Sequence, residues 1–338
     1  MSSARAVAPG RVNLIGEHTD YNRGLCLPFA IPLATTAVVT ARRDRRVSVV
    51  SDAGEPWAGE VGERPAGWAS YVTGVLWALT ELGWDLPGLD IELTSTIPLG
   101  GGLSSSAALE CSVAVAVAGL LGVEPDRAAL AEACRRAETE YVGAPTGGVD
   151  QLASMLATEG HGVLIDFADP AAPVATSVPL DLSAAGLTIL VTDTGVRHAL
   201  ADGDGGYAQR RAEAETGMPR RLRHVRTENE RVRATVAAVE AGDWAGVGAL
   251  LTASHVSLRD DYEVSVRELD LTVDAALAAG ALGARMTGGG FGGCAISLTH
   301  EGRVEAVRDG IDAAYASAGL PQPVHHRVVP AEGARLLT

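Results

Sequence analysis

Apolar residues recur at two different spacings along this chain, which predicts a mixture of strands and helices. Residues 90–97 alternate apolar and polar positions as a half-buried strand does, whereas residues 68–82 repeat at helical spacing and stop at Gly83. The same patterns predict strands over 34–40, 47–50, 90–97, 162–167, 187–192 and 294–298. They predict helices over 68–82, 104–121, 126–141, 149–156, 207–240 and 244–281.

Turn signals divide this pattern and suggest where one domain ends. The arginine-rich segment 42–46 separates two predicted strands and is typical of a solvated hairpin tip. A proline- and alanine-rich run near 168–180 predicts a turn or linker. A length of 338 residues leaves room for two domains, so we expect an N-terminal domain over 1–180 and a C-terminal domain over 181–338.

Composition narrows the possible partners and chemistry. The formal net charge of −15 disfavours nucleic acid and acidic membranes, and the arginines between 220 and 226 are expected on a solvated helix face. All 27 basic residues are arginines, because the sequence contains no lysine. A P-loop and a protein-kinase fold both need a lysine, so both are excluded. Phosphate chemistry must therefore use backbone donors, serines, arginines and metal.

The cysteines and the apolar segments indicate a cytoplasmic protein. Four scattered cysteines without a Cys-x-x-Cys pair are typical of reduced thiols rather than zinc ligands or disulfides. Residues 1–10 carry no signal-peptide pattern, and the alanine-rich run 107–121 is too short to span a bilayer. We expect no membrane association and no obligate protein partner.

The segment 97–110 contains the clearest chemical signal. Three glycines, a leucine and three serines follow one another there: Gly100, Gly101, Gly102, Leu103, Ser104, Ser105 and Ser106. An apolar, alanine-rich run comes next, so the loop opens a predicted helix. The first N–H groups of a helix lack helical partners and carry partial positive charge. We therefore expect a phosphate to bind at this loop.

A second glycine-rich loop occupies residues 287–293 and matches G-x-G-x-x-G. A dinucleotide-binding fold needs this motif between a strand and a helix, but here a helix precedes it and a strand follows. The loop is expected instead to let its backbone approach a ligand or another loop.

Two further segments gather polar groups. Glu17, His18 and Asp20 offer closely spaced donors and acceptors, as a polyhydroxylated ligand needs. An ion-paired surface turn would give the same pattern, and one histidine makes a metal site the poorer alternative. The glycine-rich turn 143–148 presents a single carboxylate, Asp150. Asp150 could cap a short helix or act as a base beside a hydroxyl.

Together, three of these segments resemble the three motifs of the GHMP kinases, which include galactokinase, homoserine kinase, mevalonate kinase and phosphomevalonate kinase. The string Gly10–Tyr21 is similar to the galactokinase signature in particular. Segments 196–198 and 257–264 are also similar to galactokinase segments. The resemblance runs from about Ala8 to Leu298, which is most of the chain.

This resemblance implies an α+β fold with two domains around a central cleft. The first would contain a left-handed β-α-β crossover, an exception to the usual handedness, and the second would be ferredoxin-like. ATP phosphates would lie at Gly100–Ser106, magnesium at Ser106 and Glu138, and adenine near Trp68. The catalytic aspartate would be Asp150, with Arg11 as its partner. The implied sugar-binding residues are Glu17, His18, Thr19, Asp20, Gly147 and Tyr207.

The implied reaction transfers the γ-phosphoryl group of ATP to the anomeric hydroxyl of α-D-galactose. Its transition state is loose, so positioning and charge stabilisation dominate. Arg11 should lower the pKa of Asp150, which leaves Asp150 either a general base or an orienting group. A kinase for another sugar (arabinose, N-acetylgalactosamine or a uronic acid) and a non-catalytic sugar and ATP sensor stay open. The complete Ser104–Ala108 run, with Asp150 and Arg11, favours an active kinase.

Overall fold

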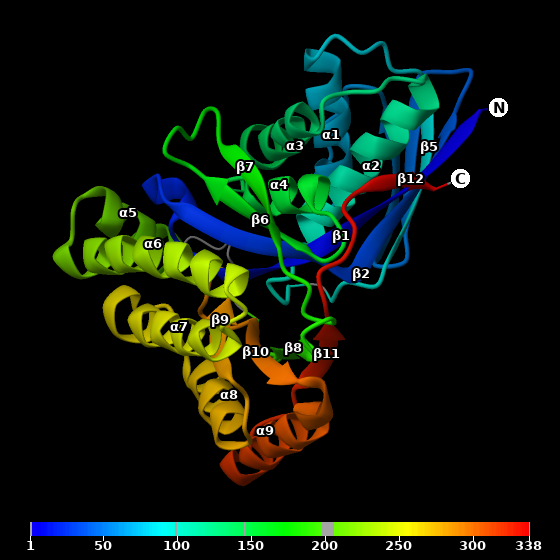
Figure 1. Ribbon diagram of the computed structural model, residues 1–338. Helices are drawn as coiled ribbons and strands as arrows, with labels where there is room; N and C mark the ends of the chain where they lie inside the picture. Colours follow the sequence, from blue (N-terminus) through cyan, green and yellow to red (C-terminus); the bar gives the residue numbers. More distant parts are fainter. Residues whose placement is uncertain (1, 99, 145, 198–205, 338) are drawn as a thin grey trace.

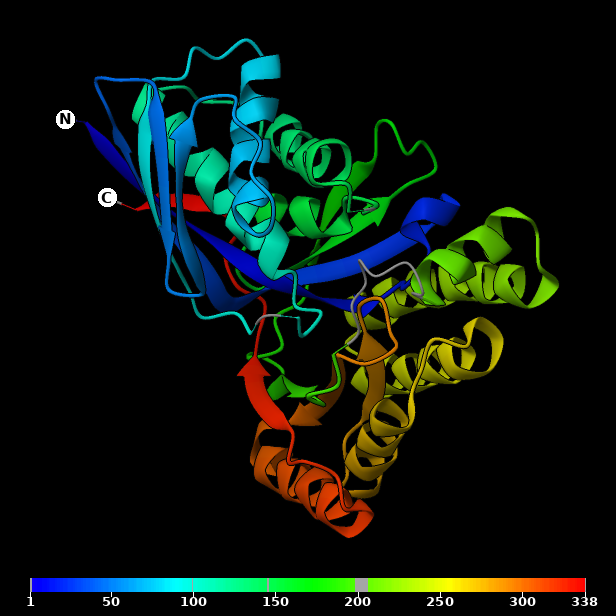
Figure 2. The ribbon, with the colours of Figure 1, turned by 180° about the vertical axis from the view of Figure 1, so that it is seen from behind.

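The chain folds around two β-sheets, which Figures 1 and 2 show from opposite sides. The computed structural model describes residues 2–98, 100–144, 146–197 and 206–337. The larger sheet has the strand order β12 (Arg335–Leu337), β1 (Ser3–Ile15), β2 (Leu25–Ala41), β5 (Leu89–Ser95), β3 (Arg46–Ser51) and β4 (Gly54–Glu60), and is extended from β2 by β6 (His161–Asp166) and β7 (Val174–Pro179). The smaller sheet has the order β11 (Val324–Val328), β8 (Leu187–Asp193), β10 (Cys294–His300) and β9 (Gly283–Thr287).

One group of helices covers the larger sheet and forms the first core with it. These helices are α1 (Ala69–Glu81), α2 (Ser105–Leu121), α3 (Arg127–Arg136) and α4 (Val149–Leu156). Every α2 residue from Ala107 to Ala118 except Leu109 is buried. Because α2 is enclosed along most of its length, the position of its N-terminus is fixed by packing.

The second half of the chain has the β-α-β-β-α-β order of a ferredoxin-like domain. All neighbouring strands of the smaller sheet run antiparallel. Between β8 and β9 lie α5 (Gly206–Glu215), α6 (Pro219–Glu240), α7 (Trp244–Ser257) and α8 (Arg267–Ala278), and between β10 and β11 lies α9 (Val304–Ala318). The predicted ferredoxin-like arrangement is confirmed.

A second core joins the two halves. Alternate residues of β8 separate two apolar clusters: Ile189 and Val191 face the larger sheet, whereas Leu190 packs against α8 and α9. The cluster between the sheets also takes side chains from β1, β2, β10, α6 and α7. Apolar packing between the halves therefore holds the edges of any site between them at fixed positions.

The predicted hairpin at 42–46 is wrong. β5 lies between β2 and β3, antiparallel to β2 and parallel to β3, so β2 and β3 do not pair. Buried Leu89, Ile91 and Leu93 make β5 a central strand, which a local pattern of two neighbouring strands cannot reveal. The connection from β3 to β5 passes through β4 and α1, and its left-handed crossover stays a prediction.

The segment predicted as a linker near 168–180 is partly a strand. β7 pairs antiparallel with β6 over Val174–Pro179, and its mostly exposed side chains hide the strand pattern. At the C-terminus β12 pairs with β1, so both ends of the chain lie at one edge of the larger sheet (Figure 1). Across the described part of the chain, no helix has the length and apolar character needed to cross a bilayer.

Candidate active site

One cleft between the two halves collects most of the predicted site residues. Its volume is about 830 Å³, and its walls include β1, the starts of α2 and α4, and the loop that precedes β10. The predicted residues that line it are Arg11, Glu17, His18, Asp20, Gly100, Gly102, Ser104, Ser105, Ser106, Glu138, Gly147, Asp150 and Tyr207. Gly101, Leu103 and Thr19 are buried and do not line it.

Arg11 and Asp150 are 139 residues apart in sequence but form an ion pair in this cleft. Arg11 Nε lies 2.7 Å and Nη2 lies 2.6 Å from Asp150 Oδ1. Arg11 Nη1 donates to the carbonyl of Gly102 at 2.7 Å, so the guanidinium also contacts the glycine loop. Burial lowers the pKa of Arg11, but the Asp150, Glu17 and Asp20 carboxylates outweigh burial and raise it. Arg11 therefore places a permanent positive charge beside the loop.

Ser104 joins the loop to Asp150 at the entry to α2. Its Oγ donates to Asp150 Oδ2 at 2.6 Å, and its backbone has the left-handed φ of 61°. A non-glycine residue in this conformation is strained, and such strain concentrates at functional sites. Within the described residues, no side chain caps the N-terminus of α2. The first N–H groups of α2 are thus left without a side-chain cap, and anion binding there stays a prediction.

The second glycine-rich loop packs on the first. A Cβ at Gly288 would lie 3.3 Å from the Gly102 carbonyl oxygen, and a Cβ at Gly293 would lie 3.3 Å from that of Gly101. Side chains at these positions would push the loops apart. The prediction that this segment lets backbone approach another loop is confirmed.

Glu138 and Ser106 come together as predicted, through a local structure that was not predicted. The expected helix 126–141 ends as an α-helix at Arg136 and continues as a π-helical turn, Ala137–Val142. The Glu138 carboxyl accepts hydrogen bonds from Ser106 and from Gln151 Nε2, the latter at 2.6 Å. Burial and the Asp150 charge raise the pKa of Glu138 to about 7, against the effect of these hydrogen bonds. A cation here would relieve that repulsion.

The loop after β1 places polar and aromatic groups at the other end of the cleft. Burial raises the pKa of Asp20 to about 6, and burial lowers the pKa of His18 to about 3. The His18 ring lies 5.5 Å from the Tyr207 ring and 4.7 Å from the Tyr262 ring, centroid to centroid. His18 Nδ1 is 2.6 Å from the hydroxyl of Tyr21. The neutral His18 is thus fixed among aromatic rings.

Two of the predicted sugar-binding residues also hold the structure together. The Glu17 carboxylate accepts from Asn13 Nδ2 at 3.1 Å, Thr287 Oγ1 at 3.0 Å and the Gly288 N–H at 2.7 Å. It therefore ties the first half of the chain to the second while lining the cleft. The Thr19 hydroxyl lies within 2.8 Å of the carbonyl oxygens of Gly16 and Leu25, which fixes the loop from within.

Polar residues of α6 hold the same loop from outside. His224 Nε2 is 3.1 Å from the Glu17 carbonyl oxygen, and Glu228 Oε1 accepts from the Gly16 N–H at 3.0 Å. The prediction that this charged stretch is a solvated face is wrong for Arg221, which is buried and pairs with Glu213 and Glu263. Buried polar groups need partners, and here the loop backbone and nearby carboxylates supply them.

Three observations extend or limit the predicted set. Tyr21 and Tyr71 line the cleft but were not predicted as site residues. Tyr21 lies at the end of the segment that resembles the galactokinase signature, and Tyr71 lies in the predicted helix 68–82. Trp68, expected near adenine, donates its indole N–H to the Glu55 carbonyl at 3.0 Å, and its adenine role stays a prediction. His198 of the segment 196–198 lies outside the described residues.

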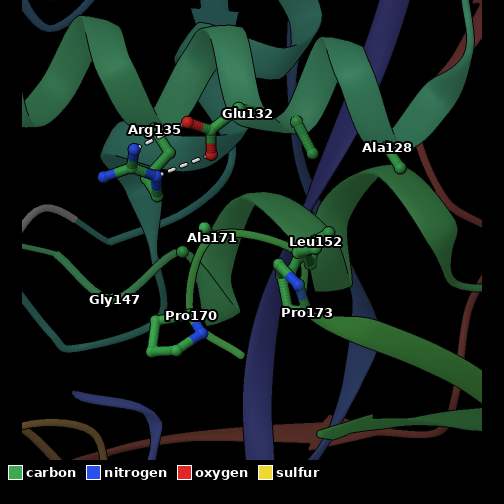
Figure 3. Close-up of a pocket in the computed structure, with 11 residues that line it drawn as sticks. Ala128, Glu132, Arg135, Gly147, Leu152, Pro170, Ala171 and Pro173 are labelled. Carbon is green, nitrogen blue, oxygen red and sulfur yellow. Dashed lines mark hydrogen bonds and ion pairs between the residues drawn. The ribbon is translucent and has the colours of Figure 1, made fainter. Parts of the chain in front are cut away.

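A smaller cavity of about 160 Å³ is lined in part by Gly147 and Gly148, and Figure 3 shows its lining residues. Alanine, leucine and proline side chains from α3, α4 and the 170–173 turn line most of it. The charged side chains in its lining, Glu132 and Arg135, pair with each other at 2.6 Å. The larger cleft is therefore the one whose polar groups suit a sugar and a phosphate.

Gly147 forms part of the wall between these cavities and allows a direct prediction. A Cβ at this position would collide with the Asp20 carboxylate. We expect Gly147→Ala to displace Asp20 and raise KM for the sugar that the resemblance implies about tenfold or more, since a hydrogen bond to a charged group contributes about 1.5–3 kcal/mol. Steady-state kinetics measure this change.

The matched control is Gly302→Ala, because a Cβ at Gly302 meets no atom within 4 Å. It should leave KM unchanged. If Gly147→Ala keeps the parental KM, the close approach of Gly147 to the Asp20 carboxylate does not matter for binding.

Three family models match this chain, and so do known proteins along nearly its whole length. The models are the galactokinase galactose-binding signature over 2–41 and the GHMP kinases N-terminal and C-terminal domains over 70–158 and 235–317. A galactokinase of Streptomyces coelicolor is 45% identical over 98% of this chain and 93% of its own. The solved Lactococcus lactis galactokinase complexed with galactose has a TM-score of 0.92 and 30% identity, over 99% of this chain and 95% of its own. Methanococcus jannaschii mevalonate kinase, 18% identical with a TM-score of 0.77 over 100% of this chain and 99% of its own, shares the fold.

Proposed function

Since this chain belongs to the galactokinase family of the GHMP kinases, we propose that its cleft transfers the γ-phosphoryl group of ATP to the anomeric hydroxyl of galactose. The observation that carries the proposal is the position of Asp150. It lies between the phosphate-binding loop, through Ser104, and the guanidinium of Arg11, in the cleft that His18, Asp20 and Tyr207 also line. A hydroxyl held beside Asp150 would face a phosphate at the start of α2.

The nucleotide end of the cleft supplies donors without any lysine. The loop N–H groups, including that of Ser104, the Ser105 hydroxyl and the start of α2 would bind the phosphates. Arg11 would stabilise negative charge on the transferring group, because its guanidinium is already held by Asp150 and Gly102 and needs little reorganisation.

The residues also fit a magnesium ion that arrives with ATP. Mg²⁺ prefers oxygen ligands and usually binds through one or two carboxylates plus substrate phosphates. Ser106 and Glu138 offer two such oxygens, and no cluster of three or more histidine, cysteine or acidic side chains occurs among the described residues to hold a metal without a nucleotide. When bound, Mg²⁺ neutralises charge on the phosphates.

Asp150 orients the sugar hydroxyl and accepts its proton. Because phosphoryl transfer passes through a loose transition state, the proton leaves the hydroxyl late, as the new P–O bond forms. Arg11 and Ser104 fix the two Asp150 oxygens, which keeps the carboxylate aimed at one point. Positioning of this kind contributes more than base strength does.

The deciding experiment measures ADP release with galactose and Mg-ATP. The control panel contains glucose, arabinose, N-acetylgalactosamine and galacturonic acid, and a second control chelates the metal. Galactose should be the best substrate, with product phosphorylated at the anomeric oxygen. A better rate with another sugar would assign a different anomeric kinase. Binding of galactose and ATP without turnover would indicate a sensor.

The four cysteines, all unpaired and buried, support a cytoplasmic compartment for this reaction.

The raised pKa of Asp20 predicts an acid limit on activity. Above about pH 6 Asp20 is a carboxylate that accepts hydrogen bonds from sugar hydroxyls, and below it the protonated form loses the negative charge and one of its two acceptor oxygens becomes a donor. The value of kcat/KM for galactose should therefore fall as pH drops through about 6, by about tenfold for each further pH unit. Kinetics between pH 5 and 8 measure it. Asp20→Asn, with no proton to gain, should lack this limb, and a limb that persists in this variant would assign it to another group.

A further inference from the structure

The side chain of Gln151 connects two carboxyl groups behind the cleft. Its Nε2 donates to Glu138 Oε2 at 2.6 Å and to Glu110 Oε2 at 3.0 Å. Gln151 and Glu110 are fully buried, and Glu138 is 8% exposed, on the side toward the cleft. Both hydrogens of one amide are thus used to hold two acids in place.

Packing does not explain this arrangement. Glu110 Oε1 and Gln151 Oε1 are buried and have no hydrogen-bond partner among the described groups. Apolar side chains of the same size would fill the space without that desolvation cost. Fold stability therefore gives no reason for an acid and an amide here, which points to a role in orienting Glu138.

The placement of the three residues fits that role. Glu110, which anchors the Gln151 amide, lies one helical turn after Ser106 on α2. The anchor and Ser106, the second proposed metal ligand, therefore belong to the same helix. Gln151 directly follows Asp150 at the start of α4. One rigid helix start therefore holds Asp150 in the cleft and, through Gln151, reaches Glu138 from behind.

We propose that Gln151, anchored by Glu110, is a positioning residue that orients the Glu138 carboxyl toward Ser106 and the metal that binds with the nucleotide. The inference rests on the proposed function. The groups behind metal ligands fix the direction of their lone pairs, and their loss typically lowers metal affinity by about 10–100-fold.

The test measures the dissociation constant of ADP with and without Mg²⁺ by calorimetry, because the ratio reports the metal contribution without turnover. In Gln151→Met, which keeps the volume but has no donor, the gain in ADP affinity from Mg²⁺ should shrink about tenfold or more. Affinities for metal-free ADP and for galactose should stay within about twofold, since these ligands do not need Glu138 oriented. The KM for Mg-ATP should rise more than kcat falls.

Matched variants separate positioning from general damage. Glu110→Gln keeps an acceptor for the Gln151 amide and should behave as the parent, whereas Glu110→Leu should behave as Gln151→Met. If Gln151→Met does not fold, Gln151→Asn is used, because its shorter side chain cannot reach both acids. An unchanged Mg²⁺ effect on ADP in a folded Gln151 variant overturns the proposal. If the parent protein phosphorylates no sugar, the proposed function is overturned instead. If Mg²⁺ does not change the ADP affinity of the parent, the proposed metal site is overturned together with the positioning role of Gln151.

Discussion

Asp150→Asn should lower kcat for galactose by about 10²–10⁴-fold, the range for loss of a group that accepts a proton in the transition state. Asparagine has the same shape, and its side-chain oxygen can still accept from Arg11, so the cleft should stay intact. The galactose dissociation constant should therefore change by no more than about threefold. Kinetics with coupled ADP detection measure kcat, and calorimetry measures the galactose dissociation constant. Thermal unfolding checks that the structure stays intact.

A surface substitution of the same kind serves as the control for Asp150→Asn. Asp309 is 67% exposed on α9 and pairs with Arg308, so Asp309→Asn should leave kcat unchanged. Near-normal turnover of Asp150→Asn would remove Asp150 from the chemistry, and the proton would then go to another acceptor. A large rise in the galactose dissociation constant with little change in kcat would make Asp150 a binding group only.

The parts of the site that the sequence predicts are those encoded within a few residues. The loop 100–106 and the start of α2 follow from glycine, serine and helix-forming residues in direct succession, and Gly100, Gly102 and Ser104–Ser106 line the cleft. The same holds for the group Glu17, His18 and Asp20. In each case the chemistry depends on local backbone, which local sequence determines.

Long-range partners are not available from such patterns. Nothing local pairs Arg11 with Asp150 across 139 residues, and only the resemblance to a family suggested that pair. Nothing local shows that β5 lies between β2 and β3, because strand order depends on the whole sheet. The buried positions of His224 and Glu228 cannot be predicted locally, because their partners, the backbone groups of Glu17 and Gly16, lie in another part of the chain.

The largest effect on sugar binding is expected from Asp20→Ala. Asp20 is a buried carboxylate that lines the cleft, and Gly147 leaves room for it by lacking a side chain. A hydrogen bond to such a charged group contributes about 1.5–3 kcal/mol, which corresponds to a loss of about 10–150-fold in kcat/KM for galactose. Since the effect removes recognition of particular hydroxyls, the preference for galactose over glucose should shrink as well.

Two other variants test whether Asp20 recognises the sugar. Asp260→Ala removes an exposed carboxylate that pairs with Arg259 on the surface, and it should leave both the rate and the sugar preference as they are. Asp20→Asn keeps one acceptor oxygen, so its loss should lie between those of Asp260→Ala and Asp20→Ala. If Asp20→Ala phosphorylates galactose as well as the parent does, the sugar hydroxyls are read elsewhere. The Glu17 carboxylate, which already accepts three hydrogen bonds, would then have to provide that recognition with its remaining lone pairs.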